Sequence, residues 1–259
     1  MEIFLQPDTW GALVTLTFLE IVLGIDNIIF ISIAANKLPE NEQKKATNIG
    51  LFLAMILRVV LLFGISFLIA MNSPLFHIDF SWFKAGVTGQ SLILFAGGLF
   101  LLYKSTKEIH HKVEGDDGHD DDGGTKKKYT LSQAIIQITL INIVFSFDSI
   151  LTAVGMTNGV EGAMIIMVTS VILSMVIMML FANPVGKFVN KHPSIQMLGL
   201  SFLILIGFML IAEAAHLSHA ELFKDKIGTI PKGYLYFAIT FSLVVEMLNM
   251  RMRGNKKNK

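Results

Sequence analysis

Two carboxylates and one amide interrupt a long apolar run in the stretch Leu19-Glu20-Ile21-Val22-Leu23-Gly24-Ile25-Asp26-Asn27-Ile28-Ile29. A charged side chain at the centre of a membrane helix costs about 2.5–3.5 kcal/mol on insertion scales, so such residues usually serve a function. The pattern returns in Ile141-Asn142-Ile143-Val144-Phe145-Ser146-Phe147-Asp148-Ser149-Ile150-Leu151. In this register Asp148 corresponds to Asp26, Asn142 to Glu20 and Ser149 to Asn27. Matching acids in two parts of one chain indicate a cation site.

The composition predicts a polytopic membrane protein. Apolar residues make up 53% of the 259 residues and charged residues 16%, whereas soluble domains carry roughly 25% charge. The apolar residues come in blocks of about 20, the length of helix that crosses a bilayer. The chain has no cysteine, which excludes disulfides and thiolate chemistry. The apolar blocks make the lipid bilayer an expected partner. The chain has no dense basic stripe, so nucleic acid is not expected as a partner.

Seven apolar blocks predict an all-α chain of seven transmembrane helices in a single transmembrane domain. Residues 10–104 are expected to form a first repeat, 105–130 a cytoplasmic acidic and histidine-rich linker, 131–215 a second repeat and 233–250 a seventh helix. The expected spans cover residues 10–35, 48–71, 90–103 (with Lys104 as an extension), 131–156, 163–182, 196–215 and 233–249. The fifth span is expected to close at Asn183-Pro184, because proline interrupts helices.

The distribution of basic residues predicts the orientation. Lys and Arg collect in the first, third and fifth loops and in the C-terminal tail, whereas the other side has only Lys84, Lys224, Lys226 and Lys232. Cytoplasmic loops are enriched in Lys and Arg. The N-terminus is therefore expected outside and the C-terminus in the cytoplasm.

The internal similarity predicts an inverted repeat. The acidic motifs fall in the first and fourth expected spans, so each repeat holds three spans and the second enters the membrane in the opposite direction. A weaker similarity aligns Gly98-Leu99-Phe100-Leu101-Leu102-Tyr103-Lys104 with Gly207-Phe208-Met209-Leu210-Ile211-Ala212-Glu213. Inverted repeats are typical of transporters whose site lies near the midplane. We therefore expect a 3+3 inverted repeat followed by the seventh helix.

The candidate ligands are oxygen donors. We expect Asp26 and Asp148 to bind the cation, and four further residues to complete or orient the shell: Asn27, Ser149, Glu20 and Asn142. Such hard donors suit magnesium, calcium or manganese. No histidine lies in the core of an expected span, which disfavours zinc and copper(II). The methionines of the fifth span leave copper(I) as an alternative, although methionine is more often an apolar filler.

The backbone near Glu20 decides whether this acid joins the site. Glu20 and Asp26 are separated by about 240° around an ideal helix. Both reach one ion only if the helix unwinds between them, and Gly24 is the expected place for a break. Ser146 holds the equivalent position in the second motif.

Other charges at span depth are expected in supporting roles. Arg58 lies at the centre of the second span and should pair with an acid, for which Glu20, Asp26 and Glu246 are the candidates. It is either a permanent ion pair or a mobile group that occupies the acid when the cation has left. Lys104 and Glu213 lie near helix ends, where long charged side chains reach the interface.

The segment from His110 to Gly124 is rich in histidine and acid. It either gathers divalent cations before transport or forms a solvated linker, and the second interpretation is favoured.

The two acidic motifs, together with Gly97-Gly98-Leu99-Phe100-Leu101-Leu102-Tyr103-Lys104 and Pro231-Lys232-Gly233-Tyr234-Leu235-Tyr236-Phe237-Ala238, closely resemble the signatures of the TerC family over nearly the whole chain. The resemblance implies a multi-pass protein of the bacterial inner membrane, in a LysE-like exporter superfamily and a family first named for tellurium-ion resistance. Some relatives are understood as manganese exporters, which implies secreted metalloproteins or the translocon as further partners. On the family pattern, Asp26 and Asp148 would be the manganese ligands.

We therefore expect an exporter of Mn²⁺, with the metal as substrate, no organic cofactor and no enzymatic activity. Nothing in the chain resembles a nucleotide-binding loop, and no histidine or paired nucleophile lies at span depth. Two alternatives stay open. One is export of Ca²⁺, and the other is a membrane scaffold in a secretion or metal-stress complex that transports nothing.

Overall fold

The structure, a computed structural model, describes residues 7–64, 71, 73–114, 129–157, 160 and 162–257. It divides into two compact units. Unit 1 comprises Met1–Ile69 and Asp122–Lys191, and unit 2 comprises Ala70–Asp121 and His192–Lys259. Each unit therefore takes helices from both of the predicted repeats.

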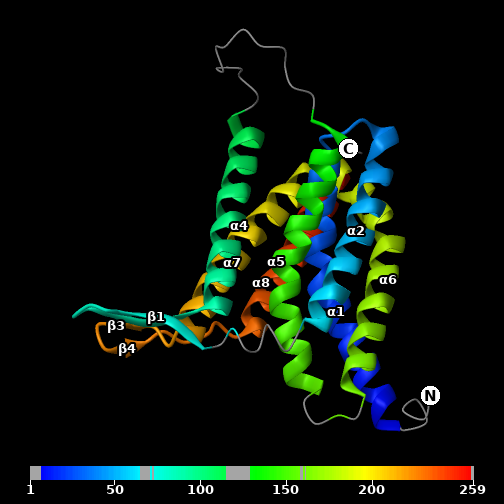
Figure 1. Ribbon diagram of the computed structural model, residues 1–259. Coiled ribbons are helices and arrows are strands. Elements are labelled where there is room, and N and C mark those ends of the chain that lie inside the picture. Colours follow the sequence, from blue (N-terminus) through cyan, green and yellow to red (C-terminus); the bar gives the residue numbers. More distant parts are fainter. Residues whose placement is uncertain are drawn as a thin grey trace. The chain divides into compact units, whose positions relative to one another are not determined.

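Unit 1 is a bundle of α1 (Pro7–Ala35), α2 (Glu40–Phe63), α5 (Leu131–Thr157) and α6 (Ala163–Lys191), which Figure 1 shows side by side. α1 packs along α6 and α2 along α5, and contacts between α1 and α5 and between α2 and α6 close the bundle. Large apolar side chains fill its interior, among them Ile31, Leu51, Ile138 and Met175.

Side-chain contacts establish that α1 and α6 run parallel. Thr17 donates a hydrogen bond to Ser170, 3.2 Å away, near the start of both helices. Near their ends, Asn36 and Asn190 exchange side-chain hydrogen bonds. The two helices therefore advance together along the bundle.

α2 and α5 run parallel in the same way, since Gly50 faces Ile138 and, two turns later, Arg58 contacts Ser149. The short connection after Ala35 turns the chain back, so α2 is antiparallel to α1. It follows that α1 and α5, which carry the two acidic motifs, run in opposite directions.

Unit 2 contains α4 (Gly89–Glu114), α7 (Pro193–Leu217) and α8 (Lys232–Lys257). α4 and α7 pack closely and run antiparallel, because Lys112 donates a hydrogen bond to Gln196 while Gly98 lies against Gly207. A Cβ atom on Gly98 would lie 2.7 Å from the carbonyl oxygen of Gly207, and one on Gly207 would lie 3.0 Å from that of Gly98. Small residues permit such close approach of membrane helices. These two glycines are the aligned first residues of the weaker internal similarity.

A small antiparallel sheet accompanies the helices of unit 2 in the order β1 (Pro74–Asp79), β2 (Phe83–Thr88), β3 (Glu221–Leu222) and β4 (Asp225–Lys226). The sequence analysis did not predict it. The alternation of apolar and polar residues in Phe76-His77-Ile78-Asp79 is the strand period of two. Each segment is short and lies between long apolar blocks, which dominate the hydropathy pattern.

The helices agree with the predicted polytopic membrane protein. Within the described residues, five helices are long and apolar enough to cross a membrane, namely α2, α5, α6, α7 and α8, and Thr9–Ile21 is a shorter apolar stretch. The number of seven spans and their orientation stay predictions.

Three predicted boundaries differ from the structure. α6 continues through Pro184 to Lys191, so the prediction that the fifth span closes at Asn183-Pro184 is wrong. Beyond this proline, Gly186 and Asn190 pack on α1, and such packing keeps a proline-containing membrane helix intact. α2 begins at Glu40, well before the expected span, and α4 extends past Lys104 to Glu114 into the expected linker. Charged turns continue both helices beyond their apolar blocks.

Candidate functional site

Three of the four helices of unit 1 carry a cluster of buried polar side chains. Glu20 and Asn27 belong to α1, Arg58 to α2, and Asn142 and Ser149 to α5, and each is at most 5% exposed. A polar group in an apolar interior is costly unless it has a partner. The cluster therefore has to be explained by the contacts within it.

Arg58 is the centre of the cluster. Its Nη2 atom lies 2.6 Å from the Glu20 carboxylate, and both side chains are at least 95% buried. The same Nη2 donates a hydrogen bond to the Ser149 hydroxyl. Arg58 thus joins α1, α2 and α5, and Glu20, one of the three acids that the sequence offered, is its partner among the described residues.

The Ser149 hydroxyl is shared between two helices. It accepts from Arg58 on α2 and lies 3.1 Å from the Ser146 carbonyl oxygen, to which it donates. Ser146 in turn donates to the Asn142 carbonyl oxygen at 2.6 Å. These serine-to-backbone bonds satisfy the hydroxyl donors within α5 and leave the oxygen of Ser149 facing α2.

Each of the two buried amides in the cluster has one atom without a hydrogen-bond partner. Among the described residues, Oδ1 of Asn27 and Nδ2 of Asn142 have no hydrogen-bond partner, and neither does Nε of Arg58. Leaving a buried polar group unsatisfied costs about 1–3 kcal/mol, so such groups call for an explanation. An unpaired amide oxygen is suited to bind a cation.

The two acids predicted as metal ligands are only partly described. Asp26 lies in α1 and Asp148 in α5, and these helices contact each other. Their side chains lie outside the described part of the structure. Of the segment from His110 to Gly124 that is rich in histidine and acid, the part up to Glu114 belongs to α4, and residues 115–124 lie outside the described residues. In the part that is described, no three His, Asp or Glu side chains come together to hold a metal ion. The predicted ligand set therefore stays a prediction.

The helix break expected at Gly24 is not seen. α1 is helical from Pro7 to Ala35 without interruption, and α5 is helical past Ser146. Gly24 serves packing instead, because a Cβ atom there would collide with the thioether of Met178 on α6. In a continuous helix Glu20 and Asp26 diverge by about 240°, and Glu20 is engaged by Arg58.

A stripe of small and polar residues on α6 escaped the sequence analysis. Ser170 and Ser174 are fully buried, and Ala182 and Gly186 continue the row at the same helical spacing, with the buried Met178 between the two pairs. Ser170 accepts from Thr17 of α1, and a Cβ atom on Gly186 would lie 2.9 Å from the Ser32 hydroxyl. Small residues four apart are the pattern that signals a close helix pair, and this pattern could have predicted the α1–α6 contact.

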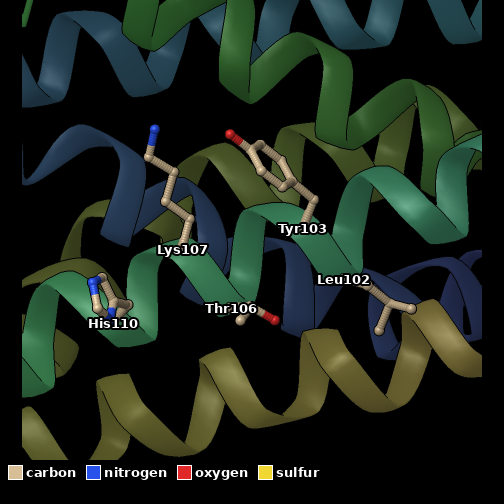
Figure 2. Close-up of a pocket in the computed structure, with 5 residues that line it drawn as sticks. All are labelled: Leu102, Tyr103, Thr106, Lys107 and His110. Carbon is tan, nitrogen blue, oxygen red and sulfur yellow. The ribbon is translucent and has the colours of Figure 1, made fainter.

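The remaining predicted residues belong to unit 2. Lys104 lies on α4 and Glu213 on α7, both half-buried. Glu246 lies on α8, where its carboxylate accepts a hydrogen bond of 3.5 Å from Asn249. A shallow surface pocket on α4 is lined by Leu102, Tyr103, Thr106, Lys107 and His110 (Figure 2). Figure 2 shows Tyr103 and Lys107 on one side of the helix and Leu102 on the other. No acid lines this pocket, so it does not resemble a cation site.

Comparison with known proteins identifies the family. The model of the integral membrane protein TerC family matches residues 5–259. The chain belongs to the TerC family. The two acidic motifs and the buried cluster around Arg58 therefore lie in a TerC protein, and the resemblance inferred from the sequence is confirmed.

Relatives of similar length support the membership. The chain is 43% identical over 253 residues to the UPF0053 inner membrane protein YgdQ of Escherichia coli K12, covering 98% of this chain and 96% of that protein. It is 42% identical over 248 residues to a UPF0053 protein of Haemophilus influenzae, covering 96% of each. A third TerC relative, the UPF0053 inner membrane protein YoaE of Escherichia coli K12, is 42% identical over 257 residues that make up 45% of its length. No solved structure shows a significant match to this chain.

Proposed function

We propose that this TerC protein exports a divalent cation, Mn²⁺, across the bacterial inner membrane through unit 1. Related proteins of Escherichia coli are named inner membrane proteins, which supports that location. The proposal rests on the two acidic motifs and on the buried polar residues Glu20, Asn27, Asn142 and Ser149 that these motifs contain.

The observation that carries the proposal is the antiparallel pairing of α1 with α5. Each helix bears one acid, Asp26 or Asp148, and the two helices pack together in the bundle. Exchanging α1 with α5 and α2 with α6 turns the α1–α6 contact into the α2–α5 contact. The same exchange leaves the α1–α5 and α2–α6 contacts as they are. This is the contact pattern expected of an inverted repeat, in which two half-sites meet near the midplane.

The buried amides supply further donors beside the acids. Asn27 follows Asp26 directly in α1, and its amide oxygen has no partner among the described residues. Oxygen atoms from carboxylates, amides and hydroxyls suit Mn²⁺ as they suit Ca²⁺. We favour Mn²⁺ because of the resemblance to manganese-exporting relatives.

Arg58 acts as a counter-ion within the transport path. It binds Glu20 and the hydroxyl of Ser149, which directly follows Asp148 in α5. In the state without metal, its positive charge offsets acidic groups that would otherwise repel one another inside an apolar bundle. On this proposal Glu20 holds Arg58 in place, and Asp26 and Asp148 hold the cation.

The test is metal flux in vesicles that contain the purified protein. Asp26→Asn and Asp148→Asn should each abolish Mn²⁺ flux while the protein still inserts and migrates as the wild type. Glu40→Gln, which changes an exposed acid in the first turn of α2, is the matched control and should transport normally.

Other outcomes separate the alternatives. If the wild type transports Ca²⁺ but not Mn²⁺, and both variants lose that flux, the substrate is Ca²⁺ and the proposed carboxylate site stands. Unchanged Mn²⁺ flux in both variants would refute the carboxylate site. Absence of any divalent flux from the wild type, together with reduced stability of both variants, would favour a membrane scaffold.

A further inference from the structure

The sheet of unit 2 lies where its helices end. β2 leads directly into α4 at Gly89. The backbone N–H of Gly86 in β2 donates to the carbonyl oxygen of Ser218, the C-cap residue of α7, at 2.8 Å. α7 is one of the helices that are long and apolar enough to cross a membrane. The sheet is therefore held at the end of a helix that has the length and composition of a membrane span.

One face of the sheet carries a row of alternating charges. Asp79 lies opposite Lys84, Lys84 opposite Glu221, and Glu221 opposite Lys226. The Nζ atom of Lys84 lies 3.0 Å from the Asp79 carboxylate. Opposite charges on paired strands stabilise a sheet. This row crosses all four strands, and its two positive and two negative charges sum to zero.

The opposite face is apolar except at its β4 edge. Side chains alternate between the two faces of a strand, and this face holds the pairs Phe76 with Val87, Ile78 with Ala85, and Phe83 with Leu222, with Asp225 opposite Leu222 on β4. Phe76 is 51% exposed and Leu222 is 40% exposed. The sheet is thus amphipathic. Its apolar face is buried at Ala85 and half-buried at Ile78, Phe83 and Val87, and it is exposed at Phe76 and Leu222.

An aromatic cluster extends this apolar face at the turns. The ring centroid of Trp82 lies 6.3 Å from that of Phe80 and 6.5 Å from that of Phe223. The backbone N–H of Phe223 donates to the Trp82 carbonyl oxygen at 2.8 Å, which fixes the two turns together. All three rings are more than half exposed. Figure 1 shows both hairpins, β1–β2 and β3–β4, extending together beyond the end of α4.

We propose that this sheet is an interfacial anchor that lies on the lipid bilayer, with its apolar face and aromatic cluster among the lipids and its charge row toward water. Tryptophan and other aromatic side chains concentrate at the membrane–water boundary. A large exposed apolar patch marks a lipid or protein contact. Lipid is the occupant here because helices that cross the membrane hold the sheet at its surface. The charge row leaves no net charge on the polar face to attract a charged partner.

The absence of cysteine from the chain makes a direct test possible. Phe76→Cys and His77→Cys change neighbouring residues on opposite faces of β1, and each variant carries one nitroxide label in a lipid nanodisc that holds one protein molecule. The label at position 76 should collide mainly with oxygen, which partitions into lipid. The label at position 77, the matched control, should collide mainly with a water-soluble nickel chelate. Equal access of the nickel chelate to both labels would overturn the proposal. Shielding of position 76 from both reagents would also overturn it, because protein would then cover the face.

The two tryptophans of the chain allow an independent measurement. Trp10→Phe leaves Trp82 as the only tryptophan, and Trp10→Phe combined with Trp82→Phe gives the background. In brominated phosphatidylcholine vesicles the Trp82 emission should be blue-shifted and should be quenched by bromine placed near the headgroups. Quenching by aqueous iodide without quenching by bromolipid would contradict the anchor. Neither measurement depends on metal transport, so the anchor and the proposed function can fail separately.

Discussion

At the scale of single residues, the pair of Arg58 and Glu20 dominates the interior of unit 1. Removing one partner of a buried ion pair leaves an uncompensated charge and costs about 3–5 kcal/mol, whereas replacing both is often nearly neutral. Ser149 adds a hydrogen bond to the same guanidinium. The three residues therefore form one energetic unit, and changes to them should not be additive.

We predict that Arg58→Met and Glu20→Gln each lower the thermal stability of the purified protein strongly, and that the double variant recovers much of the loss. Ser149→Ala removes only the hydrogen bond and should cost about 1 kcal/mol. Midpoints measured by size-exclusion chromatography after heating in detergent would test this. If the effects of the two single changes simply add in the double variant, Arg58 and Glu20 are not coupled as described.

Part of this cluster could be predicted from the sequence. The position of Arg58 within an apolar block indicated that it needs an acid, and Glu20 was among its three candidate partners. Which acid it meets depends on how α1, α2 and α5 pack, and no local pattern contains that information. The role of Gly24 was misjudged for the same reason. A glycine in an apolar run is compatible with a helix break or with a close contact, and Met178 of α6 decides between them.

At the scale of elements, close helix contacts through glycine organise both units. The α4–α7 crossing at Gly98 and Gly207 brings backbone against backbone, so no side chain can move aside to admit a methyl group. Other glycines have free space around them. Nothing lies within 4 Å of the place where a Cβ atom would stand on Gly155 of α5.

We therefore predict that Gly98→Ala destabilises unit 2 by about 1–3 kcal/mol, because the added methyl group overpacks the crossing. Gly155→Ala is the matched control and should be neutral or stabilising by up to about 1 kcal/mol, since alanine favours helix. Thermal midpoints of the two variants in the same detergent give the comparison. Equal effects of both substitutions would show that the crossing tolerates a side chain.

Most helices could be predicted from the apolar blocks, since blocks of spanning length are a strong signal. Their ends could not, because α2 and α4 continue as charged turns that hydropathy does not detect. Pro184 was taken for a helix end, yet contacts of Gly186 and Asn190 with α1 carry α6 onward. The sheet was missed because its pairing joins residues 74–88 to residues 221–226, far apart in the chain.

At the scale of the whole molecule, the compact units do not coincide with the predicted repeats. α1 and α2 come from the first repeat and α5 and α6 from the second, and all four pack in unit 1. Rocking one repeat against the other would separate α1 from α6 and α2 from α5 along their lengths. We therefore expect each unit to move as a body in any transport cycle.

The orientation predicted from the basic residues can be tested in the whole protein with two labelled positions, both in unit 2. His77→Cys lies in the sheet and Lys112→Cys near the far end of α4, and both native residues are exposed. A membrane-impermeant thiol reagent added to intact spheroplasts should label position 77 and should label position 112 only after lysis. The reverse pattern would invert the predicted topology and would place the sheet at the cytoplasmic surface.

The pairing of Arg58 with Glu20 also has a consequence for synthesis of the chain. Glu20 precedes Arg58, and the connection between α1 and α2 is short. When the ribosome delivers the arginine to the insertion machinery, the carboxylate that neutralises it has already been made and can enter with it as a helical hairpin. Ser149 follows only after a further 91 residues. The charged Arg58 therefore does not remain unpaired in the membrane until the second half of the chain is synthesised.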